Sequence, residues 1–279
     1  MAYKDLLVEL TSYPERTANA GIGQAASVAA LLGAHLTAIT FEIELPHVAN
    51  TLARSVLNID DMVAGERQKS SARARNLVSE FEAAAEQRGI SHDRVIEVCQ
   101  TSEIPDILVD HARLRDLTLV PVGDDSFQQY LAESVIFGSG RPVLILPEAA
   151  KREFALKTIA VAWDANRPAA RAVADALPLL AMADVVRAIT VVDEKPLRAR
   201  GSSSNLVRHL NHHGIAAVAD EVSADNRPVG EVLDSYCQEH DVDLLVMGAY
   251  GHSRMRDFIL GGATKSILAS PVRPVLLAH

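Results

Sequence analysis

The residues best suited to chemistry are glycines in the second half of the chain. They lie between an apolar run and a helical pattern: Gly248, Gly251, Gly261 and Gly262. Met247 ends the apolar run before them, and Ala263 and Thr264 open the helical pattern after them. Glycine lets a backbone turn and approach a ligand closely, and a helix N-terminus offers unpaired N–H groups to an anion. The spacing therefore predicts a backbone cradle for phosphate groups, where His252 could add a further contact.

Other phosphate-binding and catalytic motifs are missing from the sequence. No Gly-Lys-Ser or Gly-Lys-Thr triplet occurs at the Walker spacing, and a dinucleotide fingerprint would follow the first strand of its unit, not the fourth. There is no nucleophile elbow, no kinase signature and no SGGxDS-type loop after a first strand. These absences disfavour an enzyme of the ATP-pyrophosphatase type and favour a binding protein.

The elements that must position the glycines follow a plan that the chain repeats. Lys4–Leu10 is an apolar run before an Ala-rich helical pattern, and Lys157–Trp163 begins the same succession again. The ends also match, with RPVLILP at 141–147 and RPVLLAH at 273–279. The segment 147–157 between the copies is charged and polar, as expected for a linker. A duplication is therefore predicted.

Each predicted domain, 1–150 and 151–279, alternates short apolar runs with helical patterns. The runs predict strands at 5–10, 36–42, 94–98, 117–121, 142–146, 157–163, 185–192, 216–222, 243–247 and 274–278. They show little polar alternation, which is typical of parallel strands covered on both faces. The fold class predicted is α/β, with two doubly wound parallel-sheet domains in tandem. The extra length of the first domain, around Val48 to Arg88, predicts a longer second helix.

The glycine-rich stretch VMGAYGHSRMRDFILGGATKSIL resembles the universal stress proteins, in particular those with two such domains in one chain. The family pattern is G-x2-G-x9-G-[ST], and Gly262 stands where Ser or Thr is usual. The resemblance extends over essentially the whole chain. It implies a flavodoxin-like, adenine nucleotide alpha hydrolase-like fold and a stress-response role.

The resemblance also implies a ligand and its contacts. In nucleotide-binding relatives an acidic residue after the first strand contacts the adenosine, and Asp164 has that position here. Val191, at the end of the second strand of its domain, matches a valine that lies against the adenine. The glycine loop would hold the phosphates of ATP, with Mg²⁺ as a possible companion ion. A hydroxyl is lost at Gly262, which we expect to weaken binding by about 1 kcal/mol.

The first domain lacks both halves of this ligand pattern. Gly123 matches Gly248, but Asp124 and Asp125 follow it directly. Thr11 stands where the acidic residue after the first strand is expected. Because carboxylates repel phosphate, we predict that this domain does not bind ATP. A new pocket for another ligand is the alternative.

Composition limits the class of partner and the compartment. The net charge of −9 and the pI of about 5.6 disfavour nucleic acid. The cysteines, Cys99 and Cys237, lie far apart in the sequence, which suits a reducing compartment. With no signal peptide pattern and no apolar run long enough to span a bilayer, we expect a cytoplasmic protein without a membrane contact. His209, His212 and His213 share helical spacing, and a metal site there is left open.

The prediction is therefore a universal stress protein that binds an adenine nucleotide in its second domain and has at most slow ATPase activity. A nucleotide-free interaction scaffold and a binder of a different small ligand are the alternatives. In dimers of the family the last strands often pair, so the resemblance implies that the two RPVL segments meet edge to edge, which would make the chain an intramolecular pseudo-dimer. A further homodimer stays open.

Overall fold

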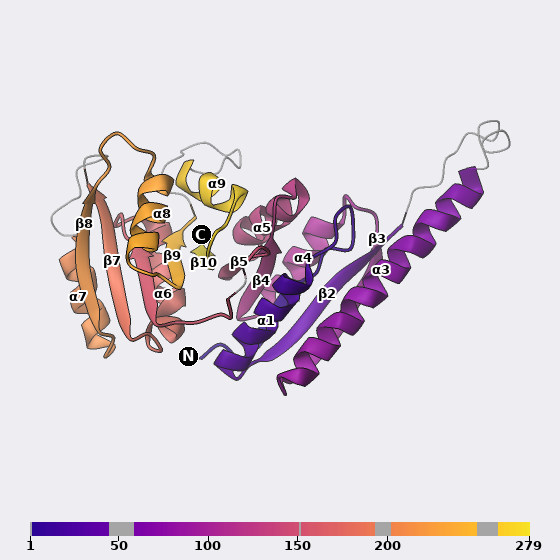
Figure 1. Cartoon of the computed structure of the whole chain (residues 1–279), viewed down its shortest axis with the longest axis horizontal. Coiled ribbons are helices and arrows are strands. Elements are labelled where there is room, and N and C mark those ends of the chain that lie inside the picture. Colours follow the sequence, from indigo (N-terminus) through magenta and orange to yellow (C-terminus); the bar gives the residue numbers. More distant parts are fainter. Residues whose placement is uncertain (1, 45–58, 151, 193–201, 250–261) are drawn as a thin grey trace.

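A single mixed sheet runs through the computed structural model, which describes residues 2–44, 59–150, 152–192, 202–249 and 262–279 (Figure 1). Within these residues the sheet has ten strands, in the order β3-β2-β1-β4-β5-β10-β9-β6-β7-β8. The elements of the first half are β1 (Asp5–Glu9), α1 (Asn19–Leu32), β2 (His35–Ile43), α3 (Ile59–Gln87), β3 (His92–Cys99), α4 (Ile104–Arg113), β4 (Leu117–Val122), α5 (Ser126–Gly138) and β5 (Val143–Pro147). Those of the second half are β6 (Thr158–Ala162), α6 (Arg167–Leu180), β7 (Val185–Val192), α7 (Ser203–His212), β8 (Ala217–Ser223), α8 (Val229–Glu239), β9 (Leu244–Gly248), α9 (Gly262–Ala269) and β10 (Val275–Ala278).

The two halves of the sheet have the same internal order. In the first half the neighbours β3-β2-β1-β4-β5 are all parallel, and in the second half β8-β7-β6-β9-β10 are parallel as well. The strand order reverses once in each half, between β1 and β4 and between β6 and β9. The predicted α/β class with doubly wound parallel sheets is confirmed.

The halves join through their last strands. β5 and β10 pair antiparallel, with Leu144 opposite Leu276. The predicted edge-to-edge pairing of the two RPVL segments is thus confirmed. Contacts beside the sheet extend the junction: the rings of Phe137 and His279 meet edge to face at 5.1 Å, and Arg171 donates to the carbonyl of Gly140 at 3.3 Å.

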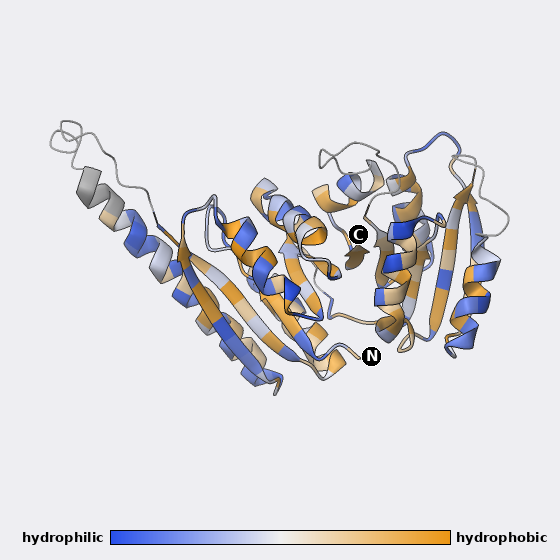
Figure 2. Cartoon of the chain, turned by 180° about the vertical axis from the view of Figure 1, so that it is seen from behind, coloured by the Kyte–Doolittle hydropathy of each residue, from blue (hydrophilic) through white to orange (hydrophobic). Residues whose placement is uncertain are grey.

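Two apolar layers cover the sheet, one on each face (Figure 2). One layer contains residues of α1, α3, α6 and α7, and the other contains residues of α4, α5, α8 and α9. Each layer draws its residues from both halves of the chain. Aliphatic side chains and alanine dominate both layers, as the low aromatic content of the sequence suggests.

The extra length of the first half includes the long helix α3, which spans 29 residues alongside β2 and β3 (Figure 1). Residues 48–58 of the helix predicted from Val48 to Arg88 lie outside the described residues. Ser70 of α3 is only 6% exposed, because its hydroxyl accepts the N–H of Ile43, the last of β2, at 2.8 Å.

Among the described residues, no helix has the length and the apolar composition that crossing a membrane requires.

Candidate functional site

The candidate site lies at the carboxyl edge of the second half of the sheet. β6 is parallel both to β7 and to β9, so the three strands end at the same edge. The strand order reverses between β6 and β9, and doubly wound folds bind ligands at such reversals. Asp164 follows β6, Val191 lies near the end of β7, and Gly248 ends β9. The fold therefore brings these three predicted site residues to one edge.

Asp164 is exposed, and its neighbours fix its carboxylate. One oxygen accepts the backbone N–H of Asn166 at 3.0 Å, and the other accepts the side-chain amide of Asn166 at 2.8 Å. The turn between them places Ala165 at a φ of 60°. This arrangement orients an anionic acceptor immediately before α6 and leaves it in contact with solvent.

Gly248 has a structural reason to be glycine. A Cβ there would lie 2.4 Å from the backbone nitrogen of Ala169 and 2.5 Å from the carbonyl carbon of Pro168. The first turn of α6 therefore rests directly on the end of β9. Met247, one residue earlier, is 6% exposed and belongs to an apolar layer. Packing alone explains both residue types.

Gly262 differs from Gly248 in this respect. It begins α9, it is exposed, and a Cβ there would meet no atom of the described chain within 4 Å. Ala263 lies against Gly230, which holds the start of α9 beside the start of α8. Thr264 is only 2% exposed. Packing within the described chain therefore gives no reason for a glycine at the start of this helix.

The remaining predicted loop residues, Gly251, His252 and Gly261, lie outside the described residues. Val191 is half-buried, packs against one apolar layer and is in register with Val222 of β8. Its position beside the end of β6 is the one that the sequence predicts.

The carboxyl edge of the first half contains a carboxyl group that was not among the predicted site residues. Glu9 ends β1 with no exposed surface, and the Thr11 hydroxyl donates to its two oxygens at 2.9 and 3.1 Å. Burial raises the pKa of Glu9 to about 8, and the charges of Glu148 and Asp125 add to the rise. The available signal was an acidic residue inside an otherwise apolar run.

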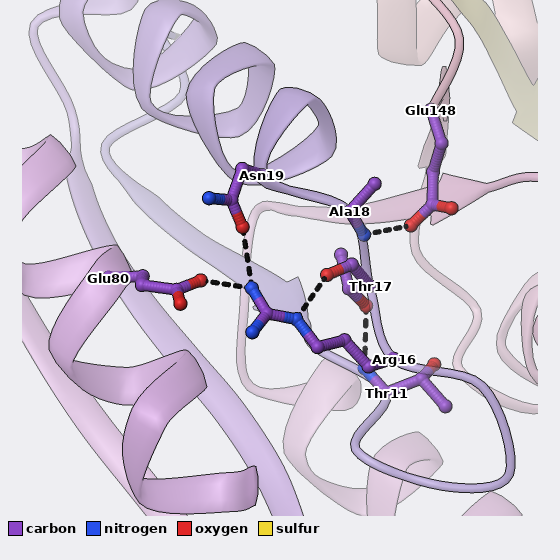
Figure 3. A network of polar contacts seen from close by, with 7 residues as sticks. All are labelled: Thr11, Arg16, Thr17, Ala18, Asn19, Glu80 and Glu148. Atoms are coloured by element: carbon purple, nitrogen blue, oxygen red, sulfur yellow. Dashed lines mark hydrogen bonds and ion pairs between the residues drawn. The ribbon is translucent and has the colours of Figure 1, made fainter.

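A second carboxylate of the first half lies against the start of α1. Glu148 accepts the backbone N–H of Ala18 at 2.9 Å (Figure 3) and the side-chain amide of Gln128 at 3.2 Å. The oxygen of that Gln128 amide accepts the N–H of Gly123 at 2.8 Å. Desolvation raises the pKa of Glu148. A helix N-terminus that could hold an external anion thus already has an internal one.

Further polar contacts hold the segment between β1 and α1 in place. The Arg16 guanidinium binds Glu80 of α3 and the side chain of Asn19, and the Thr17 hydroxyl accepts the N–H of Thr11 (Figure 3). Asp125, expected to repel phosphate, caps α5 by accepting the N–H of Phe127 at 2.9 Å.

The remaining candidate residues are the histidines at the end of α7 and the two cysteines. His209 and His213 meet ring to ring at 4.8 Å. Within the described ranges, no group of three or more His, Cys, Asp or Glu side chains could hold a metal ion. Cys99 and Cys237 are both buried, and desolvation raises their pKa values to about 11 and about 12.

The strand order and the parallel pairing define a doubly wound α/β protein. Residues 155–279 match the model of the universal stress protein family. The second half is therefore a universal stress protein domain, and the matched residues all lie in that half.

Similar proteins agree with this assignment. A stretch of 46 residues is 41% identical to "Universal stress protein Slr1230" of Synechocystis sp., which is 16% of this chain and 16% of that protein. A crystal structure of a universal stress protein from Archaeoglobus fulgidus superimposes with a TM-score of 0.71, covering 98% of this chain and 95% of that chain at 15% identity. A second structure described by the same family name, from Pseudomonas aeruginosa, has a TM-score of 0.57 at 14% identity, covering 99% of this chain and 93% of that one. Both likenesses concern the fold.

Proposed function

We propose that the chain is a tandem universal stress protein, with domains at 1–150 and 151–279, and that its second domain binds ATP with Mg²⁺. One observation carries the proposal. An exposed, oriented carboxylate at Asp164 lies beside the end of β9, at the only reversal of strand order in the described second half. The match of residues 155–279 to the family model supports it.

The proposed contacts follow from the groups available. The Asp164 carboxylate is an acceptor for ribose hydroxyls, and half-buried Val191 offers an apolar surface to the base. The first turn of α9 has backbone N–H groups without helical partners, and Gly262 leaves them open to a phosphate. We propose the cytoplasm as the compartment, because both cysteines are free thiols.

The test is isothermal calorimetry of the intact chain with ATP and Mg²⁺, after removal of any nucleotide that co-purifies. Asp164→Asn keeps an oxygen for the Asn166 N–H but removes the charge. We expect affinity to fall about tenfold, because hydrogen bonds to charged groups contribute roughly 1.5–3 kcal/mol. Asp124→Asn, which removes the charge of an exposed acid on the loop after β4 of the first half, is the control and should leave affinity unchanged. Equal affinity of Asp164→Asn and the wild type would remove the proposed site.

A nucleotide-free interaction scaffold is a second candidate that specific contacts favour. Gly248 is required by the Pro168–Ala169 backbone, and Asp164 is engaged by Asn166, so both have purely structural explanations. Affinity capture of partners with and without ATP separates the candidates. A partner set that changes with ATP favours the nucleotide-dependent function, and an unchanged set together with no calorimetric heat favours the scaffold.

A further inference from the structure

Two exposed arginines lie at the carboxyl edge of the second half. Arg167 begins α6, after β6, and Arg227 lies just before α8, after β8. Among the described residues, neither guanidinium forms a hydrogen bond or an ion pair. Because arginine stays protonated at every physiological pH, this edge has two positive charges that can pair with an anion from solution.

Arg167 is held beside the end of β9. A Cβ on Gly248 would lie 2.5 Å from the carbonyl carbon of Pro168 and 2.4 Å from the nitrogen of Ala169, the two residues that follow Arg167. The first turn of α6 is therefore fixed against that strand end. Because α6 belongs to the apolar layer that it shares with α7, Arg167 reaches the end of β9 from that face of the sheet.

Arg227 reaches the same edge from the opposite face, on which α8 and α9 lie. Asp225 and Asn226, at φ values of 48° and 59°, turn the chain before it. Three residues after Arg227, Gly230 packs on α9, where a Cβ would lie 3.5 Å from the Cα of Ala263. Three residues span at most about 11 Å, so Arg227 lies near the start of α9.

The acidic side chains of this edge do not neutralise the two arginines. Asp164 accepts two hydrogen bonds from Asn166, and Asp225 accepts the hydroxyl of Ser223 at 2.7 Å. Glu231 is exposed in the first turn of α8. In the described chain, none of these three carboxylates forms an ion pair with either arginine. Both guanidinium groups therefore remain available to an external anion.

The corresponding places in the first half have no such charge. Asn19 begins α1, the counterpart of α6, and residues 100–103, before α4, contain no Lys or Arg. Arg16, which precedes α1, is ion-paired with Glu80 of α3. At these two places the available positive charge is therefore a property of the second half alone.

We propose that Arg167 and Arg227 bind the terminal phosphates of the nucleotide from opposite faces of the sheet, and that they make the site select ATP over AMP. Guanidinium groups form strong, often bidentate hydrogen bonds to phosphate oxygens. AMP lacks the terminal phosphates, so it gains nothing from these arginines. The inference rests on the proposed function, because it names the residues that bind the phosphate chain at that same site.

Calorimetry of the intact chain with ATP and with AMP, each with Mg²⁺, tests the inference. Arg167→Gln and Arg227→Gln each remove one charge at an exposed position, and the double variant removes both. Arg73→Gln, at an exposed position on α3 of the first half, is the matched control because it changes the net charge equally. Asp164→Asn reports in the same experiment whether the nucleotide occupies the proposed site.

We expect the wild type to bind ATP about a hundredfold more tightly than AMP, with about tenfold from each arginine, as for one charge-assisted contact. Each single variant should therefore weaken ATP binding about tenfold and leave the affinity for AMP unchanged. The double variant should bind ATP and AMP with similar affinities. Arg73→Gln should change neither affinity.

Three results would overturn the inference, and they differ in what they mean for the proposed function. If Asp164→Asn weakens ATP binding and both arginine variants leave it unchanged, the proposed function stands without the arginines. If an arginine variant weakens ATP and AMP binding equally, that arginine does not act on the terminal phosphates. If the wild type binds neither nucleotide, the proposed function fails together with the inference.

Discussion

The carboxyl edges of the two halves have the same strand order but differ in where their acidic side chains lie. In the first half, Glu9 is buried at the end of β1 and Glu148 accepts from the start of α1. In the second half, Ala162 ends β6, and the acidic residue, Asp164, lies outside the core and faces solvent. In the first half a carboxylate of the chain itself accepts the N–H at the start of α1. In the second half a carboxylate is exposed to solvent.

This difference shows that two copies of one strand order can have different polar groups at the same edge. A helix N-terminus and a strand-end glycine remain in the first half, but Glu148 and Gln128 already bind them. An external phosphate would have to displace Glu148 and approach a second carboxyl group, Glu9. The same backbone plan can therefore be open in one copy and closed in the other.

The largest effect is expected from alanine at the two strand-end glycines. In Gly248→Ala the new Cβ meets backbone atoms of Pro168 and Ala169, which cannot move independently of α6. We expect a loss of about 3 kcal/mol or more in the free energy of unfolding, at the upper end of overpacking effects. In Gly123→Ala the nearest atom, 2.9 Å away, is the carboxylate end of Glu148. A side chain can rotate, so we expect on the order of 1 kcal/mol. Urea unfolding of both variants checks this, and equal losses would mean that the two edges are packed alike.

The second prediction concerns pH. The pKa of Glu9 is raised to about 8 in the folded protein, so the folded state keeps a proton that the unfolded chain loses near its ordinary value of 4.5. Stability is therefore full below the unfolded pKa and falls as the pH rises toward 8, by at most roughly 1.4 kcal/mol per unit. Glu9→Gln imitates the protonated form and should flatten this decline between pH 5 and pH 8, an interval set by the two pKa values.

The control for this prediction is Glu221→Gln, at an exposed position on β8. It should retain the wild-type dependence of unfolding free energy on pH. If Glu9→Gln retained it as well, the buried carboxyl group would not be the source of the decline.

The third prediction concerns Gly262, at the carboxyl edge of the second half. Gly262→Ser places a hydroxyl at the start of α9, where a Cβ meets no atom of the described residues within 4 Å. One added hydrogen bond to phosphate contributes about 1 kcal/mol, so ATP should bind several-fold more tightly. Gly262→Ala is the matched control without the hydroxyl and should leave affinity near that of the wild type. Calorimetry measures both, and an equal gain in the two variants would exclude the hydroxyl as its cause.

The smallest effect is expected at the cysteines, one in each half. Cys99 and Cys237 are buried with raised pKa values, so a thiol reagent at pH 8 should label neither in the folded protein and both in urea. Rapid labelling of one cysteine under native conditions would show that its half opens locally.

The fold could be predicted from the sequence because its signals are local. Apolar runs predicted the strands, whereas the pairing of β5 with β10 was predicted from the resemblance to dimers of the universal stress protein family. The contacts of Gly248 and Glu148 could not be predicted, since their partners are distant in sequence: Pro168 in one case, and Ala18, 130 residues away, in the other. Local sequence identifies a glycine or a carboxylate, but only the folded chain shows what it touches.

Asp164 shows how far the prediction of the site extends. Its place after the first strand of the second half was predictable from the repeat, whereas its hydrogen bonds to Asn166 required the geometry of the turn. Glu9 is an acid inside an apolar run, two residues before Thr11, which has the position that corresponds to Asp164.

Photolabelling of the intact chain with an azido-adenine derivative of ATP, followed by mapping of the labelled peptides, tests the central claim most directly. We expect the labelling that excess ATP suppresses to occur only in peptides from residues 151–279 and to be weaker in Asp164→Asn, in line with its lower affinity. Labelling of peptides from residues 1–150 that excess ATP suppresses would contradict this expectation. Such labelling would mean that the edge at which Glu9 and Glu148 lie also accepts a nucleotide.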